Sequence, residues 1–174
     1  LDNAAFGAIY KDWAIFAYDN SGINFQEALD VWAHEFTHAL TSTLQGYMLY
    51  QNDQGAINES MSGIMGNLFE ILIENENDHF WKVGEDTTQT VRAMMDPHAF
   101  GQPEYVWDLY YGTATSKPND INDRGGVHVN SAILNLLAAR LCGEYGMPAG
   151  IARDFWLRLA SMLTPMTDLP KIAD

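Results

Sequence analysis

The sequence of 174 residues has little of what defines several large classes of protein. It contains one cysteine, Cys142, so it cannot form an internal disulfide, and the apolar run before it favours a buried thiol. Lysine and arginine number 9 against 23 aspartates and glutamates, which gives a formal net charge of −14. Such a charge repels phosphate backbones and anionic lipid surfaces, so we expect no nucleic-acid partner and no membrane partner.

Long apolar runs, internal repeats and Pro/Ser-rich linkers are also missing. No uncharged apolar stretch is long enough to cross a bilayer. The chain starts at Leu1 without a signal-peptide pattern, so we expect a mature chain or an excised piece. With 47% hydrophobic residues, it can bury one core, and we expect a single domain over residues 1–174.

Apolar residues recur at helical spacing in four stretches, which predicts a mainly helical fold. The stretches are 26–45, 57–75, a segment that follows Gly125 and Gly126, and 149–163. Residues 13–18 are aromatic and β-prone and predict a strand of a short N-terminal hairpin or edge segment. Residues 76–124 are rich in Asp, Asn, Gly and Pro and predict a long loop, which in a compact domain is usually functional.

The first helical stretch contains an H-E-x-x-H motif made by His34, Glu35 and His38. A spacing of four residues puts both imidazoles on one helix face, where they can chelate zinc. This polar face lies opposite the apolar stripe of the same helix. An alternative interpretation is a helical core in which the two histidines are ordinary side chains.

A zinc site of this kind needs a third protein ligand, and Glu59 is the candidate. It lies near the start of the second helical stretch, whose other face is apolar. If the two helices are antiparallel, the connecting loop brings Glu59 back beside the histidines. A lone helical glutamate is otherwise most often a solvated residue.

Three ordered motifs together resemble the thermolysin-like zinc metallopeptidases, the gluzincin type in which a glutamate is the third zinc ligand. These motifs are residues 34–38, 55–59 and 123–131, and the resemblance covers nearly the whole chain. It implies the helical lobe of a thermolysin-like (zincin) fold, with residues 1–24 as an edge-strand segment and residues 25–174 as the zinc-binding lobe. The N-terminal β-rich domain and the last helix of such catalytic units are expected to be absent.

The resemblance implies a zinc-dependent endopeptidase. It implies one catalytic zinc, held by His34, His38 and Glu59, with Glu35 as the general base acting on the metal-bound water. The expected partner is a peptide or protein substrate, together with a pro-segment or β-rich domain of the parent chain. Because members of this family are usually secreted, the resemblance also implies a secreted protein.

Further residues are implied to contact the reacting peptide. Tyr50 and His128 would donate to the oxyanion, and Asp123 would hold the His128 imidazole in orientation. Arg92 and Asn3 match positions that contact the substrate main chain. A group of apolar residues would line the pocket after the scissile bond, which suggests a preference for an apolar residue there: Phe25, Val31, Val83 and Val91.

The resemblance also implies one structural calcium ion beside the active site. Four carboxylates fall on or near the corresponding positions: Asp30, Glu70, Asp78 and Glu85. In an antiparallel helix pair, Asp30 and Glu70 are displaced from the zinc ligands toward the same end, which is consistent with a shared site. Glu74 and Glu76 compete with Asp78 for its role.

The chain departs from the family pattern at Gly63, where relatives usually have an Asp that accepts a hydrogen bond from the first zinc histidine. The loss of such a partner predicts weaker zinc binding. Water, a backbone carbonyl or Ser62 are alternative partners for His34. The departure also motivates a second function hypothesis, a non-catalytic or weakly active metal-stabilised binding module derived from such a peptidase.

Overall fold

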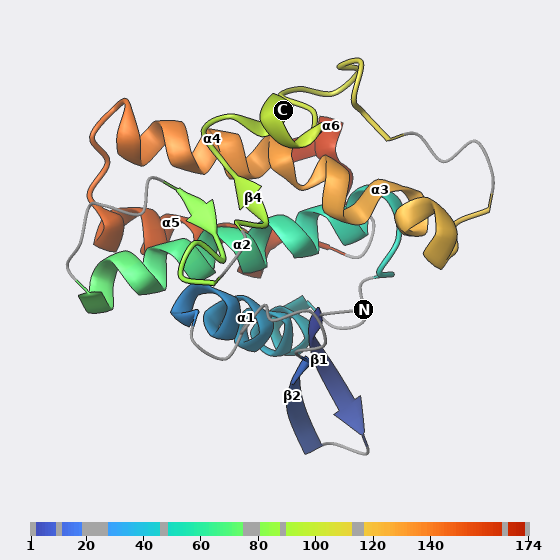
Figure 1. The fold of residues 1–174 in the computed structure, drawn as a ribbon, viewed down its shortest axis with the longest axis horizontal. Helices are drawn as coiled ribbons and strands as arrows, with labels where there is room; N and C mark the ends of the chain where they lie inside the picture. Colours follow the sequence, from blue (N-terminus) through green and yellow to red (C-terminus); the bar gives the residue numbers. More distant parts are fainter. Residues whose placement is uncertain are drawn as a thin grey trace.

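A computed structural model describes residues 3–9, 12–18, 28–45, 49–74, 81–87, 90–112, 117–164 and 167–172. The chain opens with an antiparallel hairpin of strands β1 (Asn3–Ile9) and β2 (Asp12–Tyr18), in which Asn3 pairs with Tyr18. The hairpin contacts the first helix, α1 (Leu29–Gln45), and the remaining helices lie on the other side of α1 (Figure 1). The predicted mainly helical fold with a short N-terminal hairpin is therefore confirmed.

Helices α1 and α2 (Asn52–Glu74) pack as an antiparallel pair. Asn58 on α2 bonds to Thr41 on α1, whereas Gly66, two turns later, lies against Asp30, about three turns earlier on α1. A Cβ at Gly66 would lie 2.6 Å from the Asp30 carbonyl oxygen, so only glycine allows the two backbones to approach this closely. The pairing brings the H-E-x-x-H face of α1 against the Glu59 face of α2.

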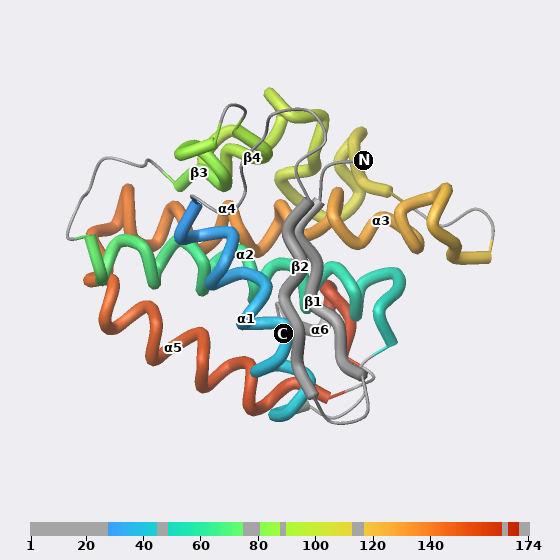
Figure 2. Tube along the Cα trace, turned by 60° about the horizontal axis from the view of Figure 1, so that its bottom comes forward, coloured from blue at the N-terminus to red at the C-terminus, as the bar shows by residue number. Residues whose placement is uncertain are grey.

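Helix α2 begins at Asn52, five residues before the predicted start at 57. Its first turn buries small residues instead of a large apolar stripe, and a Cβ at Gly55 would lie 2.3 Å from Val127 Cγ1. The helix is the centre of the fold, because it contacts α1 and four later helices (Figure 2). Its buried apolar side chains include Ile57, Met61, Ile64 and Leu68.

The later helices are α3 (Asp123–Asn130), α4 (Ala132–Gly143), α5 (Ala149–Met162) and the short α6 (Leu169–Ile172), which the sequence did not predict. The stretch after the Gly-Gly pair therefore forms two helices that meet at Ser131. Trp156 on α5 is almost fully buried in the core. None of the described helices combines the length and hydropathy needed to cross a membrane.

The described part of residues 76–124 is mostly loop, as predicted. It contains two-residue strands β3 (Lys82–Val83) and β4 (Arg92–Ala93), which pair with each other, and the 3₁₀ helices η1 (Pro97–Phe100) and η2 (Asp120–Asn122). Strand β4 places Arg92 beside Glu59 of α2, and η2 leads directly into α3.

Candidate functional site

Three side-chain donors from α1 and α2 meet at one point. His34 Nε2 lies 3.1 Å from His38 Nε2 and 3.5 Å from Glu59 Oε2, and His38 Nε2 lies 3.3 Å from Glu59 Oε1. Glu59 is 1% exposed. Donors about 2.05 Å from a tetrahedral metal ion are separated from one another by about 3.3 Å. The three donors therefore stand at the mutual separations of a zinc ligand set.

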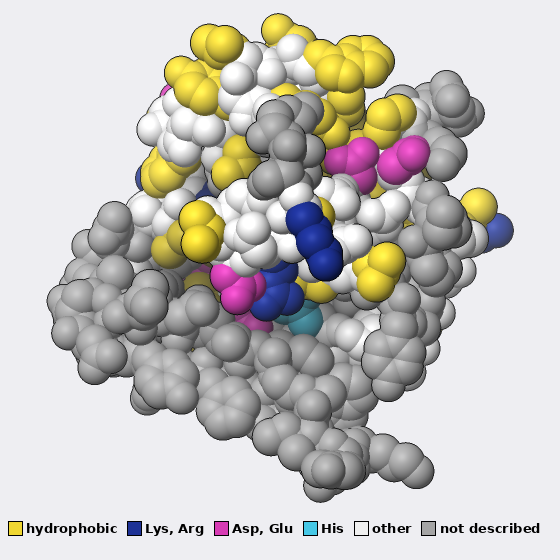
Figure 3. Space-filling view, turned by 90° about the vertical axis from the view of Figure 1, so that its right-hand side faces the viewer, with side chains coloured by type: hydrophobic (Ala, Val, Ile, Leu, Met, Phe, Trp, Pro, Cys, Tyr) yellow, Lys and Arg dark blue, Asp and Glu magenta, His cyan; other side chains and the backbone are white. Residues whose placement is uncertain are grey.

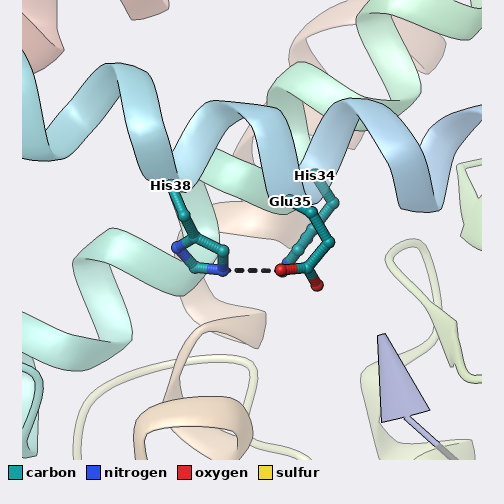
Figure 4. Close-up of side chains that lie close together, drawn as sticks. All are labelled: His34, Glu35 and His38. Atoms are coloured by element: carbon teal, nitrogen blue, oxygen red, sulfur yellow. Dashed lines mark hydrogen bonds between the residues drawn. The ribbon is translucent and has the colours of Figure 1, made fainter. Parts of the chain in front are cut away.

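Glu35 is buried and lies one residue after His34 on α1. Its carboxylate faces the imidazole of His38 (Figure 4), and the nearest ligand atoms of His34, Glu35 and His38 all lie within 4.8 Å of one another. Glu35 thus has a carboxylate at the edge of the cluster without contributing to the set of three donors described above.

Burial and charge tune the ionisation of the cluster. Burial lowers the pKa of His34 to about 4, so its imidazole is neutral and can ligate a metal near pH 7. Burial would raise the pKa of Glu59, but His34 and His38 lower it well below its usual value. Glu59 is therefore an anion, which suits a hard or borderline cation.

The two histidines differ in what holds their second nitrogen. His38 Nδ1 lies 2.6 Å from Asn58 Oδ1 and 3.1 Å from Ser62 Oγ, so Ser62 serves His38 and not His34. His34 Nδ1 is buried and has no hydrogen-bond partner among the residues that the structure describes. Gly63, where the chain departs from the family pattern, follows Glu59 by one turn of α2, and a Cβ there would face Met94 and Asn135.

Tyr50 and His128 lie over the Oε1 side of the Glu59 carboxylate. The Tyr50 hydroxyl donates a hydrogen bond to Glu59 Oε1 and lies 3.2 Å from His128 Nε2. Burial, followed by the charge of Glu59, raises the pKa of Tyr50, so its hydroxyl stays protonated as a donor. The Tyr50 hydroxyl and His128 Nε2 therefore lie side by side at the edge of the cluster.

Asp123 orients His128. Its Oδ1 lies 2.5 Å from His128 Nδ1, and its Oδ2 accepts hydrogen bonds from the backbone N–H groups of His128 and Val129. Partial burial would raise the pKa of Asp123, but these hydrogen bonds and the charge of His128 lower it. The carboxylate is thus ionised and fixes the ring with Nε2 toward Tyr50.

Arg92 is 9% exposed and places Nη2 3.5 Å from Glu59 Oε2, on the side opposite Tyr50. Its Nη1 is buried and has no hydrogen-bond partner within the described ranges. Asn3, the other residue expected to contact a main chain, begins strand β1. Residues Phe25 and Asp78 lie outside the described residues.

A loop residue that sequence reasoning missed contacts the His128 backbone. Gln102 is 9% exposed, and its Nε2 donates to the His128 carbonyl oxygen at 3.2 Å, where Ser131 Oγ also donates at 2.7 Å. The loop is closed by His98 and Asp108, whose Nε2 and Oδ2 atoms are 2.8 Å apart. No sequence signal distinguishes Gln102, because its role depends on the path of the loop.

We predict that Asp108→Asn lowers the pKa of His98 toward 6.5, measured by proton NMR against pH. The hydrogen bond to Asp108 raises the pKa of His98, so its stabilisation is complete below pH 6.5 and is lost as pH rises through the raised value. The backbone N–H of Glu104 and then His98 lower the pKa of Asp108 to about 2, so its stabilisation is complete above pH 3.8 and is lost as pH falls. The loop is held best between these limits, and an unchanged His98 titration in the variant contradicts the pairing.

Asp30, near the start of α1, and a cluster of acidic residues near the end of α2 lie at the end of the helix pair that is away from Glu59. Asp30 accepts hydrogen bonds at 2.7 Å from the backbone N–H groups of Val31 and Gly84. Ligand atoms of Glu70, Glu74 and Asp86 lie within 4.8 Å of one another. Glu85 is half-buried beside Asp86 in the sequence. The calcium ligand set of Asp30, Glu70, Asp78 and Glu85 stays a prediction.

The apolar residues expected to line a pocket differ in burial. Val31 and Val83 are buried, and both belong to the hydrophobic core, whereas Val91 is 40% exposed. The expected preference for an apolar residue after the scissile bond therefore stays a prediction.

Comparison with known proteins assigns the family. A family model described as the thermolysin metallopeptidase α-helical domain matches residues 46–164. Bacillolysin from Bacillus caldolyticus and thermolysin from Alicyclobacillus acidocaldarius subsp. acidocaldarius are each 37% identical over 163 residues, which cover 85% of this chain. The chain spans only 28% of the length of these two relatives.

A solved structure agrees with this assignment. The precursor of protealysin, a metalloproteinase from Serratia proteamaculans, superposes with a TM-score of 0.72 at 26% identity, and the match covers 89% of this chain and 52% of that one. Both the resemblance inferred from the motifs and the helical-lobe fold are thereby confirmed. The chain belongs to the thermolysin metallopeptidase family and contains the α-helical domain of that family.

Proposed function

We propose that the chain is the zinc-binding, catalytic part of an endopeptidase that hydrolyses peptide bonds with an activated water. The observation that carries the proposal is the convergence of His34, His38 and Glu59 at separations of 3.1–3.5 Å, which match the edges of a zinc tetrahedron. Two imidazoles and one carboxylate are ligand types of catalytic zinc sites.

A zinc ion in such a site acts as a Lewis acid and lowers the pKa of coordinated water to about 7. Glu35 supplies a carboxylate beside the three ligands, positioned to take a proton from the attacking water and deliver it to the leaving amine. Its burial keeps competing solvent away from that proton transfer.

The other residues of the cluster bind and stabilise the substrate in this proposal. Tyr50 and His128 donate hydrogen bonds to the developing oxyanion, and Asp123 keeps the His128 ring aligned. Arg92 offers Nη1 to a carbonyl oxygen of the peptide. Asn3 contributes a main-chain contact from β1.

Further parts of the proposal follow from the family alone. They are a single structural calcium, an apolar residue after the scissile bond, a pro-segment or β-rich domain elsewhere in the parent chain, and secretion. The alternative of a non-catalytic binding module is not favoured by the relatives, which include a thermostable neutral protease and a zinc metalloproteinase.

The deciding experiment is zinc stoichiometry combined with peptide cleavage by the full-length protein. One bound zinc with metal-dependent cleavage supports the proposal. One bound zinc without cleavage of any peptide in a diverse library favours the binding module. No metal-dependent change in melting temperature favours a core in which the histidines are ordinary side chains.

We predict that Gly63→Asp tightens zinc binding by about tenfold, because metal-ligating histidines gain affinity when their second nitrogen has a hydrogen-bond partner. An added Cβ meets Met94 Cε at 3.2 Å and Asn135 Oδ1 at 3.3 Å, and the flexible Met94 side chain can shift. Competition with a chelator measures the affinity. Gly150→Asp is the control, since a Cβ there meets nothing within 4 Å. Equal affinity of the Gly63 variant and the parent contradicts the expectation.

A further inference from the structure

Arg124 is held in a fixed backbone position beside the cluster. Four successive residues at the start of α3 have positive φ angles, of which Asp123 has 52° and Arg124 has 49°. The following glycines fix this segment by close contacts. A Cβ at Gly125 would lie 2.1 Å from Asn52 Oδ1, and one at Gly126 would lie 3.0 Å from the Gly112 carbonyl oxygen. The direction in which the Arg124 side chain leaves the backbone is therefore set by packing.

The Arg124 side chain lies against Tyr50. Its guanidinium carbon is 5.4 Å from the centroid of the Tyr50 ring, within cation–π range. The hydroxyl of the same tyrosine lies 3.2 Å from His128 Nε2. The guanidinium is thus separated from the proposed oxyanion donors by one aromatic ring, and it lies within reach of a peptide bound there.

The guanidinium already holds a carboxylate. Arg124 Nε lies 2.8 Å from Asp120 Oδ1, but the Arg124 side chain is 48% exposed and that of Asp120 is 83% exposed. An ion pair this exposed is weak and readily exchanged. The contacts found among the described residues engage only Nε and the ring face, which leaves the two terminal nitrogens for a second carboxylate.

The two arginines of the site lie on opposite sides of the Glu59 carboxylate. Arg92 approaches Oε2, whereas Tyr50, with Arg124 over its ring, approaches Oε1. A peptide extended across the cluster therefore meets one guanidinium on each side of the scissile bond. On the face that contains α3, Lys and Arg side chains lie next to a histidine and to acidic side chains (Figure 3). These positive side chains lie on a chain whose net charge is −14.

We propose that Arg124 is a specificity-determining residue that binds an acidic side chain of the substrate near the scissile bond, on the side away from Arg92. The inference rests on the proposed peptidase function. Arginine suits this task because its planar fork pairs with a carboxylate through two parallel hydrogen bonds. Asp120 occupies the guanidinium in the free protein and exchanges for the substrate carboxylate.

The test compares kcat/KM of the zinc-loaded, full-length protein for peptides that differ only by Glu, Gln or Lys at one position beside the scissile bond. We expect Glu to exceed Gln by about tenfold, the range of a charge-assisted hydrogen-bonded pair. Arg124→Asn brings the ratio close to one, and Arg124→Asp reverses the preference toward Lys. Asn and Asp both tolerate positive φ, so neither variant strains the backbone.

Two further measurements separate specificity from folding. Arg153→Asn removes an exposed arginine on α5 that pairs with Asp154, and it leaves the ratio unchanged. Binding of the same peptides to the Glu35→Gln variant, measured by calorimetry, shows the same order of affinity. If the protein cleaves peptides but kcat/KM is about equal for the Glu and Gln peptides, this inference is overturned and the proposed function stands. The same holds if Arg124→Asn leaves the ratio of the two kcat/KM values unchanged. Cleavage of no peptide overturns both.

Discussion

Replacing Glu35 by Gln lowers kcat for peptide hydrolysis by about 1000-fold, within the range that general acid–base catalysis contributes. The amide keeps the size of the side chain but cannot accept the proton of the attacking water. Because His34, His38 and Glu59 are untouched, the variant still binds one zinc ion. Steady-state kinetics on a peptide substrate, together with metal analysis of the same sample, measure both quantities.

A surface carboxylate provides the matched control for this experiment. Glu144 follows α4, is exposed and lies 3.7 Å from Arg140, so Glu144→Gln keeps full activity. Equal activity of the Glu35→Gln variant and the parent contradicts the assignment of Glu35 as the group that carries the proton. Loss of zinc in the Glu35 variant places Glu35 among the ligands instead.

Replacing Glu59 by Ala abolishes stoichiometric zinc binding and lowers the free energy of unfolding of the metal-free protein by about 3–5 kcal/mol. Glu59 is 1% exposed, and it faces Arg92, which is 9% exposed. Removing the carboxylate leaves a buried guanidinium without its counter-charge. For a domain of this size the loss corresponds to a fall in melting temperature of about 6–20 °C.

Thermal denaturation in the presence of a chelator measures this effect without any contribution from bound metal. The double variant Glu59→Ala/Arg92→Ala recovers part of the stability, because the uncompensated charge is then removed as well. Asp154→Ala, on the exposed face of α5, leaves the melting temperature unchanged within a degree or two. A Glu59→Ala variant as stable as the parent is incompatible with the buried ion pair described above.

The sequence predicts most of the fold because the long helices bury large apolar side chains at helical spacing. It misplaces the start of α2, where the buried residues are Gly55 and Ala56 and the apolar stripe begins only later. It also starts the third helical stretch after Gly126, whereas α3 begins at Asp123, because the positive φ angles of residues 123–126 arise with contacts to Asn52 and Gly112, far away in the chain. The spacing of apolar residues within one segment does not predict contacts with residues elsewhere in the chain.

The residues of the candidate site likewise differ in whether local spacing predicts them. His34 and His38 lie one turn apart on one helix, so local geometry alone brings them together, and the antiparallel partner helix adds Glu59. Gln102 and Arg124, by contrast, reach the site through loop paths and left-handed backbone that no spacing rule encodes. The group formed by Glu70, Glu74 and Asp86 likewise depends on a contact between Asp86 and the end of α2 that no spacing rule predicts.

The close approach at Gly66 has a consequence for the choice of metal ion. Because the α1 and α2 backbones touch there, main-chain contact fixes the distance between the helix that contains the histidines and the helix that contains Glu59, so the donors can move apart only through side-chain rotation. A site with donors held 3.1–3.5 Å apart suits an ion of small ionic radius and penalises larger ions such as cadmium, which need longer bonds. A glycine two turns away from the donors thereby contributes to metal selectivity.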